Sequence, residues 1–211
     1  MPRRKIEFFN DGVYHIYNRG VDKRDIVSDS YDQLRFLRTL NIFNTTEYVG
    51  SVLEYDIDKK NSTIGAPSTN GAELVEIIAF NLLDNHYHLV LKQLVDGGIS
   101  KFMSSWSGGY ARYFNEKYDR AGPLFQGAFK ASPVGERVEE IIAYVNLNHM
   151  IHGFGAPSTK WGIRSSWREY GDKMAGVVQI TKWKGFDKRR CIEIAKELKK
   201  KKEEMKKNEF E

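Results

Sequence analysis

The chain has a single cysteine, no long hydrophobic run and no apolar segment near its start. Because Cys191 has no partner within the chain, an internal disulfide is excluded, as is usual for proteins of a reducing compartment. No stretch approaches the roughly 18 continuous apolar residues of a membrane-spanning helix. The opening residues MPRRKIEFFNDG are charged and do not predict a secretory signal. We therefore expect a cytoplasmic protein.

The net positive charge is concentrated at the C-terminal end. The whole chain has 33 Lys and Arg against 28 Asp and Glu, a formal net charge of +5. Residues 182–211 hold 12 of these bases and 7 of these acids, so this basic tail accounts for the entire excess. The tail predicts a helix with one apolar face, formed by Cys191, Ile194, Ala195 and Leu198. Its lysines either follow a phosphate backbone or form a solvated helix end.

With 211 residues, 41% of them hydrophobic, the chain is long enough for one domain with a core. We expect this domain over residues 1–160 and a C-terminal extension over 161–211. The pattern of apolar residues predicts the α+β class, with a central antiparallel sheet and flanking helices. The expected elements are a strand at 13–18, a helix at 30–43, strands at 76–83 and 86–92, a helix at 99–117, a loop and strand within 122–131, and a helix at 136–153.

Turn and loop signals separate these elements. Ser30 is the expected N-cap of the first helix. Residues 49–73 are irregular and predict an insertion, which ends in NSTIGAPSTNG. The motif GAPST occurs at 65–69 and again at 155–159, in loops, and implies no repeat array.

The segment His86-Tyr87-His88 carries the first chemical signal. Successive side chains of a strand alternate between its faces, so His86 and His88 share one face and Tyr87 takes the other. Two imidazoles on one face of a strand can bind a metal ion together. The alternative is a solvated strand face on which two polar residues happen to alternate.

The helix expected at 136–153 carries the second signal. Tyr144 and Asn148 are i and i+4 neighbours on one face of it. Facing the histidine pair, a phenol and an amide would complete a metal-assisted tyrosine nucleophile. Taken singly, Tyr144 is more typical of a half-buried tyrosine and Asn148 of a helix end.

Several blocks in order resemble the HUH single-strand endonucleases, and most of all the REP-associated tyrosine transposases among the insertion-sequence transposases. The blocks are GVYHIYNRGVDKRDIVSDSYDQLRFL (12–37), DNHYHLVLK (84–92), GGISKFMSSWSGGYARYFNEKY (97–118), GPLFQGAFKA (122–131), YVNLNHMIHG (144–153) and SSWREY (165–170). The resemblance implies the ferredoxin-like HUH endonuclease fold. It also implies that His86, His88 and Asn148 bind a metal ion and that Tyr144 is the nucleophile.

The chain departs from the family pattern at two positions. His149 stands where the family usually has proline, and Ala128 stands where an arginine is expected. Neither change touches the four implied site residues, but the second removes one candidate phosphate contact.

The resemblance further implies a metal-dependent endonuclease and strand transferase that forms a 5′-phosphotyrosine intermediate on single-stranded, hairpin or palindromic DNA. The open nitrogen and oxygen ligand set favours Mg²⁺ or Mn²⁺ over a closed zinc site. Such a protein would be nucleoid-associated and either a monomer or a homodimer. The alternatives are an HUH protein of plasmid replication or relaxation, and a non-catalytic DNA-binding protein that keeps the fold.

Basic and aromatic residues elsewhere are candidates for contact with the DNA. Arg19 and Lys130 suit phosphates, while Tyr110 and Arg112 suit the stacking and charge contacts of unpaired strands. Tyr110 is the main competitor of Tyr144 for the nucleophile role, and a core position is the alternative for it. His15 is a spare imidazole, expected on a strand face near the groove.

Overall fold

The fold was analysed in a computed structural model that describes residues 6–49, 71–152, 165–167, 170, 178 and 180–208. Most of the insertion predicted at 49–73 and both GAPST copies lie outside the described residues. Among the described residues, no helix combines the length and hydropathy that crossing a bilayer requires.

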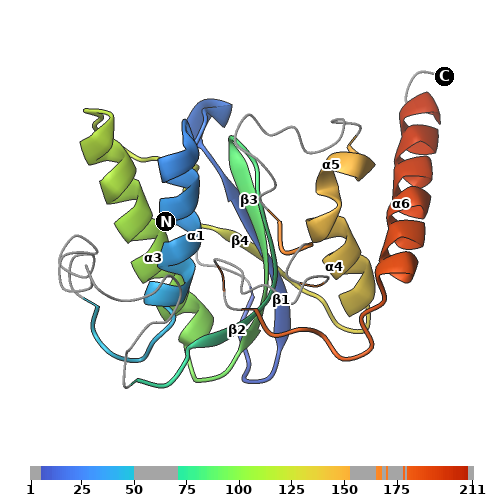
Figure 1. The fold of residues 1–211 in the computed structure, drawn as a ribbon, viewed down its shortest axis with the longest axis horizontal. Coiled ribbons are helices and arrows are strands. Elements are labelled where there is room, and N and C mark those ends of the chain that lie inside the picture. The colour runs from blue at the N-terminus through green and yellow to red at the C-terminus, as the bar shows by residue number, and fades with distance from the viewer. Residues whose placement is uncertain are drawn as a thin grey trace.

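The architecture is a four-stranded antiparallel sheet with helices on both faces, which confirms the predicted α+β class (Figure 1). The strands lie in the order β2-β3-β1-β4. The elements are β1 (Val13–Arg19), a 3-10 turn (Val21–Lys23), α1 (Ser30–Ile42), β2 (Val75–Leu82), β3 (His86–Gln93), α3 (Gly98–Lys117), β4 (Lys130–Pro133), α4 (Val138–Asn146), α5 (Asn148–Ile151) and α6 (Lys188–Asn208).

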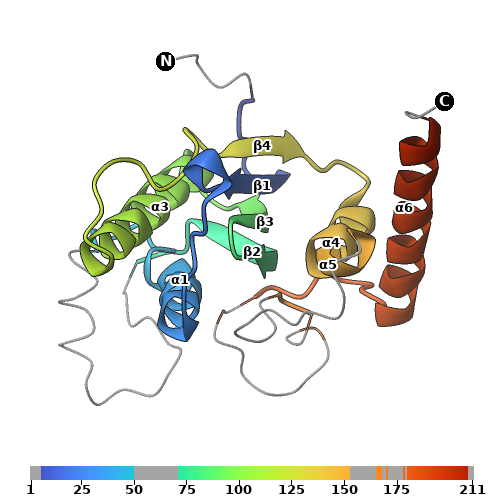
Figure 2. The same cartoon turned by 90° about the horizontal axis from the view of Figure 1, so that it is seen from above.

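The sheet separates two apolar layers, because alternate strand residues point to opposite faces. Figure 2 shows α1 and α3 on one face and α4 on the other, with α6 outside α4. Tyr87 and Leu89 of β3 pack in the α1 and α3 layer, whereas Val90 packs with Ile142 in the α4 layer. The side chains of His86 and His88 therefore belong to the α4 side.

The N-cap of α1 is Asp29, so the prediction of Ser30 was wrong by one residue. The Asp29 side chain accepts from the Asp32 backbone N–H at 2.8 Å, and the Asp32 side chain accepts from the Asp29 N–H at 3.3 Å. This reciprocal capping box satisfies two backbone donors at once, which a serine cap one residue later would not do here.

The helix predicted at 136–153 is two helices, α4 and α5, that meet at Leu147. Leu147 has φ −111° and ψ 23°, outside the α-helical region, and its side chain is buried against Ile151 and Ala195 of α6. The buried Asn146 accepts a hydrogen bond from Ser166 Oγ at 2.7 Å. These two buried contacts favour a break at this point over a straight helix.

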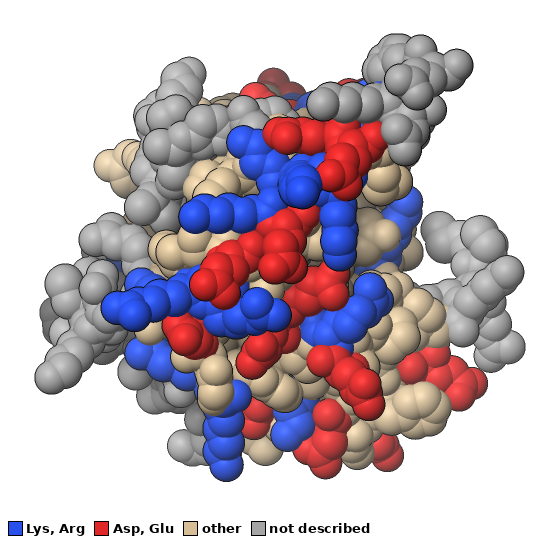
Figure 3. Space-filling model, turned by 90° about the vertical axis from the view of Figure 1, so that its right-hand side faces the viewer, with Lys and Arg blue, Asp and Glu red and all other residues tan. Residues whose placement is uncertain are grey.

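The C-terminal helix α6 packs along α4 and α5, where Cys191 and Ile194 contact Ala143. The predicted apolar face of this helix is confirmed. On the outward side, Lys199 and Lys200 pair with Glu203 and Glu204 one turn on. Figure 3 shows basic and acidic side chains interspersed over this side of the molecule, so the basic tail presents no uniform positive surface there.

A buried carboxylate joins α1 to the last turn of α3. Asp32, fully buried, accepts from Lys117 Nζ at 2.7 Å and from the hydroxyls of Tyr113 at 2.9 Å and Tyr118 at 2.8 Å. We expect Asp32→Ala to lower the free energy of unfolding by about 3 kcal/mol, because it removes a buried carboxylate that accepts from Lys117 and two tyrosine hydroxyls and closes the capping box of α1. Urea denaturation measures this change.

The matched control is Arg112→Ala, which breaks the exposed i,i+4 pair with Glu116 (2.8 Å) on the same helix α3. This surface pair contributes less than about 1 kcal/mol. Equal losses in the two variants would contradict a structural role for the Asp32 cluster.

Candidate active site

The two histidines of β3 lie on the same face of the sheet, as their spacing predicts. Their ring centroids are 5.2 Å apart and the ring planes are nearly perpendicular. His88 is buried at 7% exposure, and Tyr87 between them is fully buried in the opposite layer.

Helix α4 carries the Tyr144 ring to the same place. Its centroid lies 5.6 Å from that of His88 and 5.9 Å from that of His15 on β1. Burial raises the pKa of the Tyr144 phenol, the Asn148 side chain beside it acts in the opposite direction, and Tyr17 raises it further. A protonated phenol thus lies among imidazole rings at the edge of the α4 layer.

Asn148 begins α5, directly after the break at Leu147. Its side chain is 1% exposed, and the buried amide nitrogen has no hydrogen-bond partner among the described residues. A half-turn of the amide exchanges its oxygen and nitrogen without changing its shape. A buried amide next to Tyr144 that can present its oxygen has the chemistry of a metal ligand.

The His86 ring is held by the turn that precedes β3. Its Nδ1 lies 2.7 Å from Oδ1 of Asn85, an oxygen that only accepts, so Nδ1 carries the proton and Nε2 keeps its lone pair. A neutral imidazole with a free Nε2 is a competent metal ligand. No group of three or more His, Cys, Asp or Glu side chains in the described part of the chain is arranged to hold an ion.

Burial keeps the three imidazoles of the sheet neutral. It lowers the pKa of His15 to about 4 and lowers those of His86 and His88 as well. The neighbouring rings lower the pKa of His88 further, because a second positive charge is unfavourable in this cluster.

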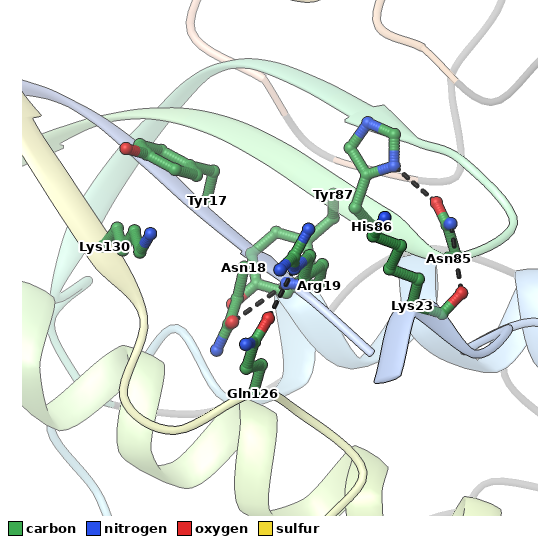
Figure 4. Close-up of a pocket in the computed structure, with 9 residues that line it drawn as sticks. All are labelled: Tyr17, Asn18, Arg19, Lys23, Asn85, His86, Tyr87, Gln126 and Lys130. Atoms are coloured by element: carbon green, nitrogen blue, oxygen red, sulfur yellow. Dashed lines mark hydrogen bonds between the residues drawn. The ribbon is translucent and has the colours of Figure 1, made fainter. Parts of the chain in front are cut away.

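A pocket of about 480 Å³ opens beside His86 (Figure 4). It is lined by Tyr17, Asn18, Arg19, Lys23, Asn85, His86, Tyr87, Gln126 and Lys130. Arg19 Nε donates to the side chain of Gln126, while Lys130 lies beside Tyr17 on the other side of the pocket. Three basic side chains around one opening suit an anionic ligand.

The other predicted DNA contacts fall elsewhere. Tyr110 is fully buried and donates to the carbonyl of Ile26 at 2.6 Å, so the structure contradicts its predicted contact with DNA and its candidacy as a nucleophile. Its neighbours Phe36 and Phe125 explain this, because the α3 face that bears Tyr110 packs on the core. Arg112 is exposed on α3 and lies outside the pocket, and its contact with DNA stays a prediction.

Tyr144 also has a neighbour that the sequence analysis did not single out. The phenol oxygen lies 3.5 Å from Nε2 of His152, and Nδ1 of that ring accepts from Lys202 Nζ of α6. Since an ammonium group only donates, the neutral His152 ring carries its proton on Nε2, facing the phenol. Burial and two nearby lysines lower the pKa of His152, which favours the neutral form.

Tyr17 was missed as well. It pairs with His88 across β1 and β3, and its ring centroid lies 5.1 Å from His15 and 5.9 Å from His88. The alternation of VYHIYN puts it on the same strand face as His15, so the pattern contains this signal once the pairing of β1 with β3 is known. No comparable signal exists for His152, which depends on the docking of α6.

Comparison with protein-family models shows the family to which the chain belongs. The model described as "Transposase IS200 like" matches residues 37–148, more than half of the chain and all four implied site residues. The protein belongs to this IS200-like transposase family.

A solved structure, described as the REP-associated tyrosine transposase bound to a REP hairpin, has a similar fold. The TM-score is 0.50 at 14% sequence identity, and the match covers 89% of this chain and 98% of that one. At this identity the likeness establishes the fold alone. A comparison with curated proteins finds no significant match.

The buried histidines make stability depend on pH. In the unfolded chain an imidazole titrates near pH 6.5, whereas the folded pKa of His15 is about 4. Between these values the unfolded state binds more protons, so stability falls as the pH drops below about 6.5. For His15 we expect a total loss of about 1.4 kcal/mol between pH 7.5 and 5.5, measured by urea denaturation in EDTA.

His15→Gln is the control for this dependence, because glutamine does not titrate. The free energy of unfolding should fall less steeply with decreasing pH in His15→Gln than in the wild type, by the contribution of one imidazole. Parallel curves for the two proteins would mean that His15 is solvated or protonated in the folded state.

Proposed function

We propose that this protein is a metal-dependent endonuclease and strand transferase that cleaves single-stranded DNA through a 5′-phosphotyrosine intermediate at Tyr144. Hairpin or palindromic DNA is the proposed substrate. The observation that carries the proposal is the convergence of His86, His88 and Tyr144 from β3 and α4 on one side of the sheet.

Membership of the IS200-like transposase family supports this proposal. The neighbour of similar fold is described as bound to a REP hairpin, and we extend a hairpin substrate to this chain as part of the proposal.

His86, His88 and Asn148 would hold a divalent ion, Mg²⁺ or Mn²⁺. When bound, such an ion withdraws charge from a phosphate oxygen and orients the phosphorus for attack. The two rings offer neutral nitrogen ligands and the amide offers an oxygen, a mixed set that Mn²⁺ accepts more readily than Mg²⁺ does.

In the proposed step the phenol oxygen of Tyr144 forms a bond to phosphorus as the bond from phosphorus to the 3′ oxygen breaks. The phenol gives up one proton and the departing 3′ oxygen gains one, so the products are a phosphotyrosine and a free 3′-hydroxyl. The new ester retains the energy of the old one, so a later 3′-hydroxyl can reverse the attack and join strands.

Tyr144 needs help to react, because burial raises the pKa of its phenol above the usual value of about 10. The Nε2–H of His152 faces the phenol oxygen and would stabilise negative charge that develops there. Lys202 holds His152 in this tautomer from α6. The C-terminal helix thereby supports the nucleophile in this proposal.

The basic pocket next to His86 would receive the strand beside the cleaved phosphate. Its volume of about 480 Å³ lies in the usual range of ligand sites. Arg19, Lys23 and Lys130 suit phosphate oxygens, and the ring of Tyr17 offers a stacking surface.

A cleavage assay on labelled hairpin oligonucleotides from the flanks of the gene tests the nucleophile. With Mn²⁺ or Mg²⁺ we expect a covalent protein–DNA adduct on a denaturing gel. The adduct should disappear in Tyr144→Phe, because phenylalanine lacks the attacking oxygen, and in EDTA.

Tyr17→Phe is the matched control, since it removes the other phenol near His88. This variant should still form the adduct. An adduct that survives Tyr144→Phe and is lost in Tyr17→Phe would move the nucleophile to β1. Binding without any adduct on every hairpin would favour a non-catalytic DNA-binding protein.

Salt dependence of binding to single-stranded DNA tests the pocket. Each phosphate contact adds about 0.7 to the slope of log K against log salt for single strands. We expect Arg19→Ala and Lys130→Ala each to flatten the slope by about this amount, as measured by fluorescence anisotropy with catalytically inactive Tyr144→Phe protein.

Arg112→Gln serves as the comparison, because Arg112 is a cation on α3 outside the pocket and is already paired with Glu116. A flattening in Arg112→Gln as large as in Arg19→Ala would place the strand along α3 and count against the pocket.

A further inference from the structure

The contact between His15 and His88 is the closest one within the histidine cluster. Nε2 of His15 lies 2.9 Å from Nδ1 of His88, and the ring planes differ by only 20°. Both rings are nearly buried, at 8% and 7% exposure. His15 faces Val90 in the register of β1 and β3, so it is the diagonal neighbour of His88 on the α4 face.

This contact leaves His88 one nitrogen for a metal ion. Nδ1 is engaged by His15, so the ligating atom would be Nε2, which must then carry a lone pair. A neutral imidazole with a lone pair on Nε2 has its proton on Nδ1. His88 therefore donates and His15 Nε2 accepts.

We infer that His15 is a positioning residue, which fixes the tautomer and the ring orientation of His88 so that Nε2 is presented as a metal ligand. The inference rests on the proposed function. Metal-binding histidines commonly have such a partner on the second ring nitrogen.

The rings of the two proposed ligands on β3 are then oriented in the same way, by an acceptor for the Nδ1 proton. Asn85 accepts the Nδ1 proton of His86 at the start of the strand, and His15 accepts that of His88 from the adjacent strand. Both acceptors are neutral. A carboxylate in either place would add negative charge beside a phosphate, whereas an amide or an imidazole orients the ligand without repelling the DNA backbone.

The tautomer can be measured without metal or DNA. Long-range proton–nitrogen spectra of protein with ¹⁵N-labelled histidine, recorded in EDTA, report which nitrogen of each ring carries the proton. We expect His88 as the Nδ1–H form in the wild type and in His15→Gln, whose amide oxygen can still accept. In His15→Leu the Nε2–H form should appear. A wild-type His88 protonated on Nε2, or a tautomer unchanged in His15→Leu, would overturn the inference.

Titration with Mn²⁺, followed by electron paramagnetic resonance of the free ion, gives the second readout. Loss of an orienting partner typically weakens a metal site by about 10- to 100-fold, which we expect for His15→Leu and not for His15→Gln. His149→Leu is the matched control, because His149 is a half-exposed imidazole of α5 with no assigned role. Thermal unfolding checks that each variant is folded.

Two results separate this inference from the proposed function. If wild-type protein binds no Mn²⁺, the proposed metal chemistry fails, and the tautomer spectra still decide the role of His15. If the wild type binds Mn²⁺ and His15→Leu binds it equally well, only the inference fails. Loss of one metal-bound nitrogen in His15→Gln, detected by electron spin echo spectroscopy, would make His15 a ligand and overturn its positioning role.

Discussion

The antiparallel pairing of β1 with β3 places Tyr17 opposite His88 and Arg19 opposite His86. Hydrogen bonds between the two strands fix this register, and a shift by one residue would turn every side chain of β1 to the other face. The histidine cluster, the stacked tyrosine and the arginine of the basic pocket all depend on it. The same register places Ile16 and Tyr87 in the opposite layer. The packing of the core under α1 and α3 and the arrangement of the site therefore depend on the same strand pairing.

Helix α4 completes the site from the other side, and its position depends on buried polar contacts as well as apolar packing. Asn81 of β2 donates to the carbonyl of Val145 at 2.7 Å. Ser166 bridges the helix and the sheet, since its hydroxyl donates to Asn146 and accepts from the Phe80 N–H. Misplacing a buried polar group costs more than misplacing an apolar one, so these bonds define one position for Tyr144 relative to the strands.

The sequence predicted the fold class, most strand and helix bounds and the shared face of His86 and His88, because these follow from periodicity within short segments. It did not predict the break at Leu147, which depends on burial against α6, nor the Asp29 cap, which depends on the Asp32 side chain. Tyr110 was misassigned because an aromatic on a helix has the same local pattern whether it faces the core or the solvent. The contact between His152 and Lys202 joins α5 to α6, and local sequence patterns do not predict contacts between separate elements. The contact of His152 with Tyr144 depends on the same arrangement.

The single cysteine lies in the seam between α4 and α6, at 2% exposure against Ala143. Burial raises the pKa of its thiol to about 11, so the native protein offers almost no thiolate to an alkylating reagent. Labelling of Cys191 therefore requires that α6 first separates from the helix that bears Tyr144. The chain thus contains its own reporter of that separation, and the rate of alkylation under native conditions measures how often α6 leaves the helix that bears Tyr144.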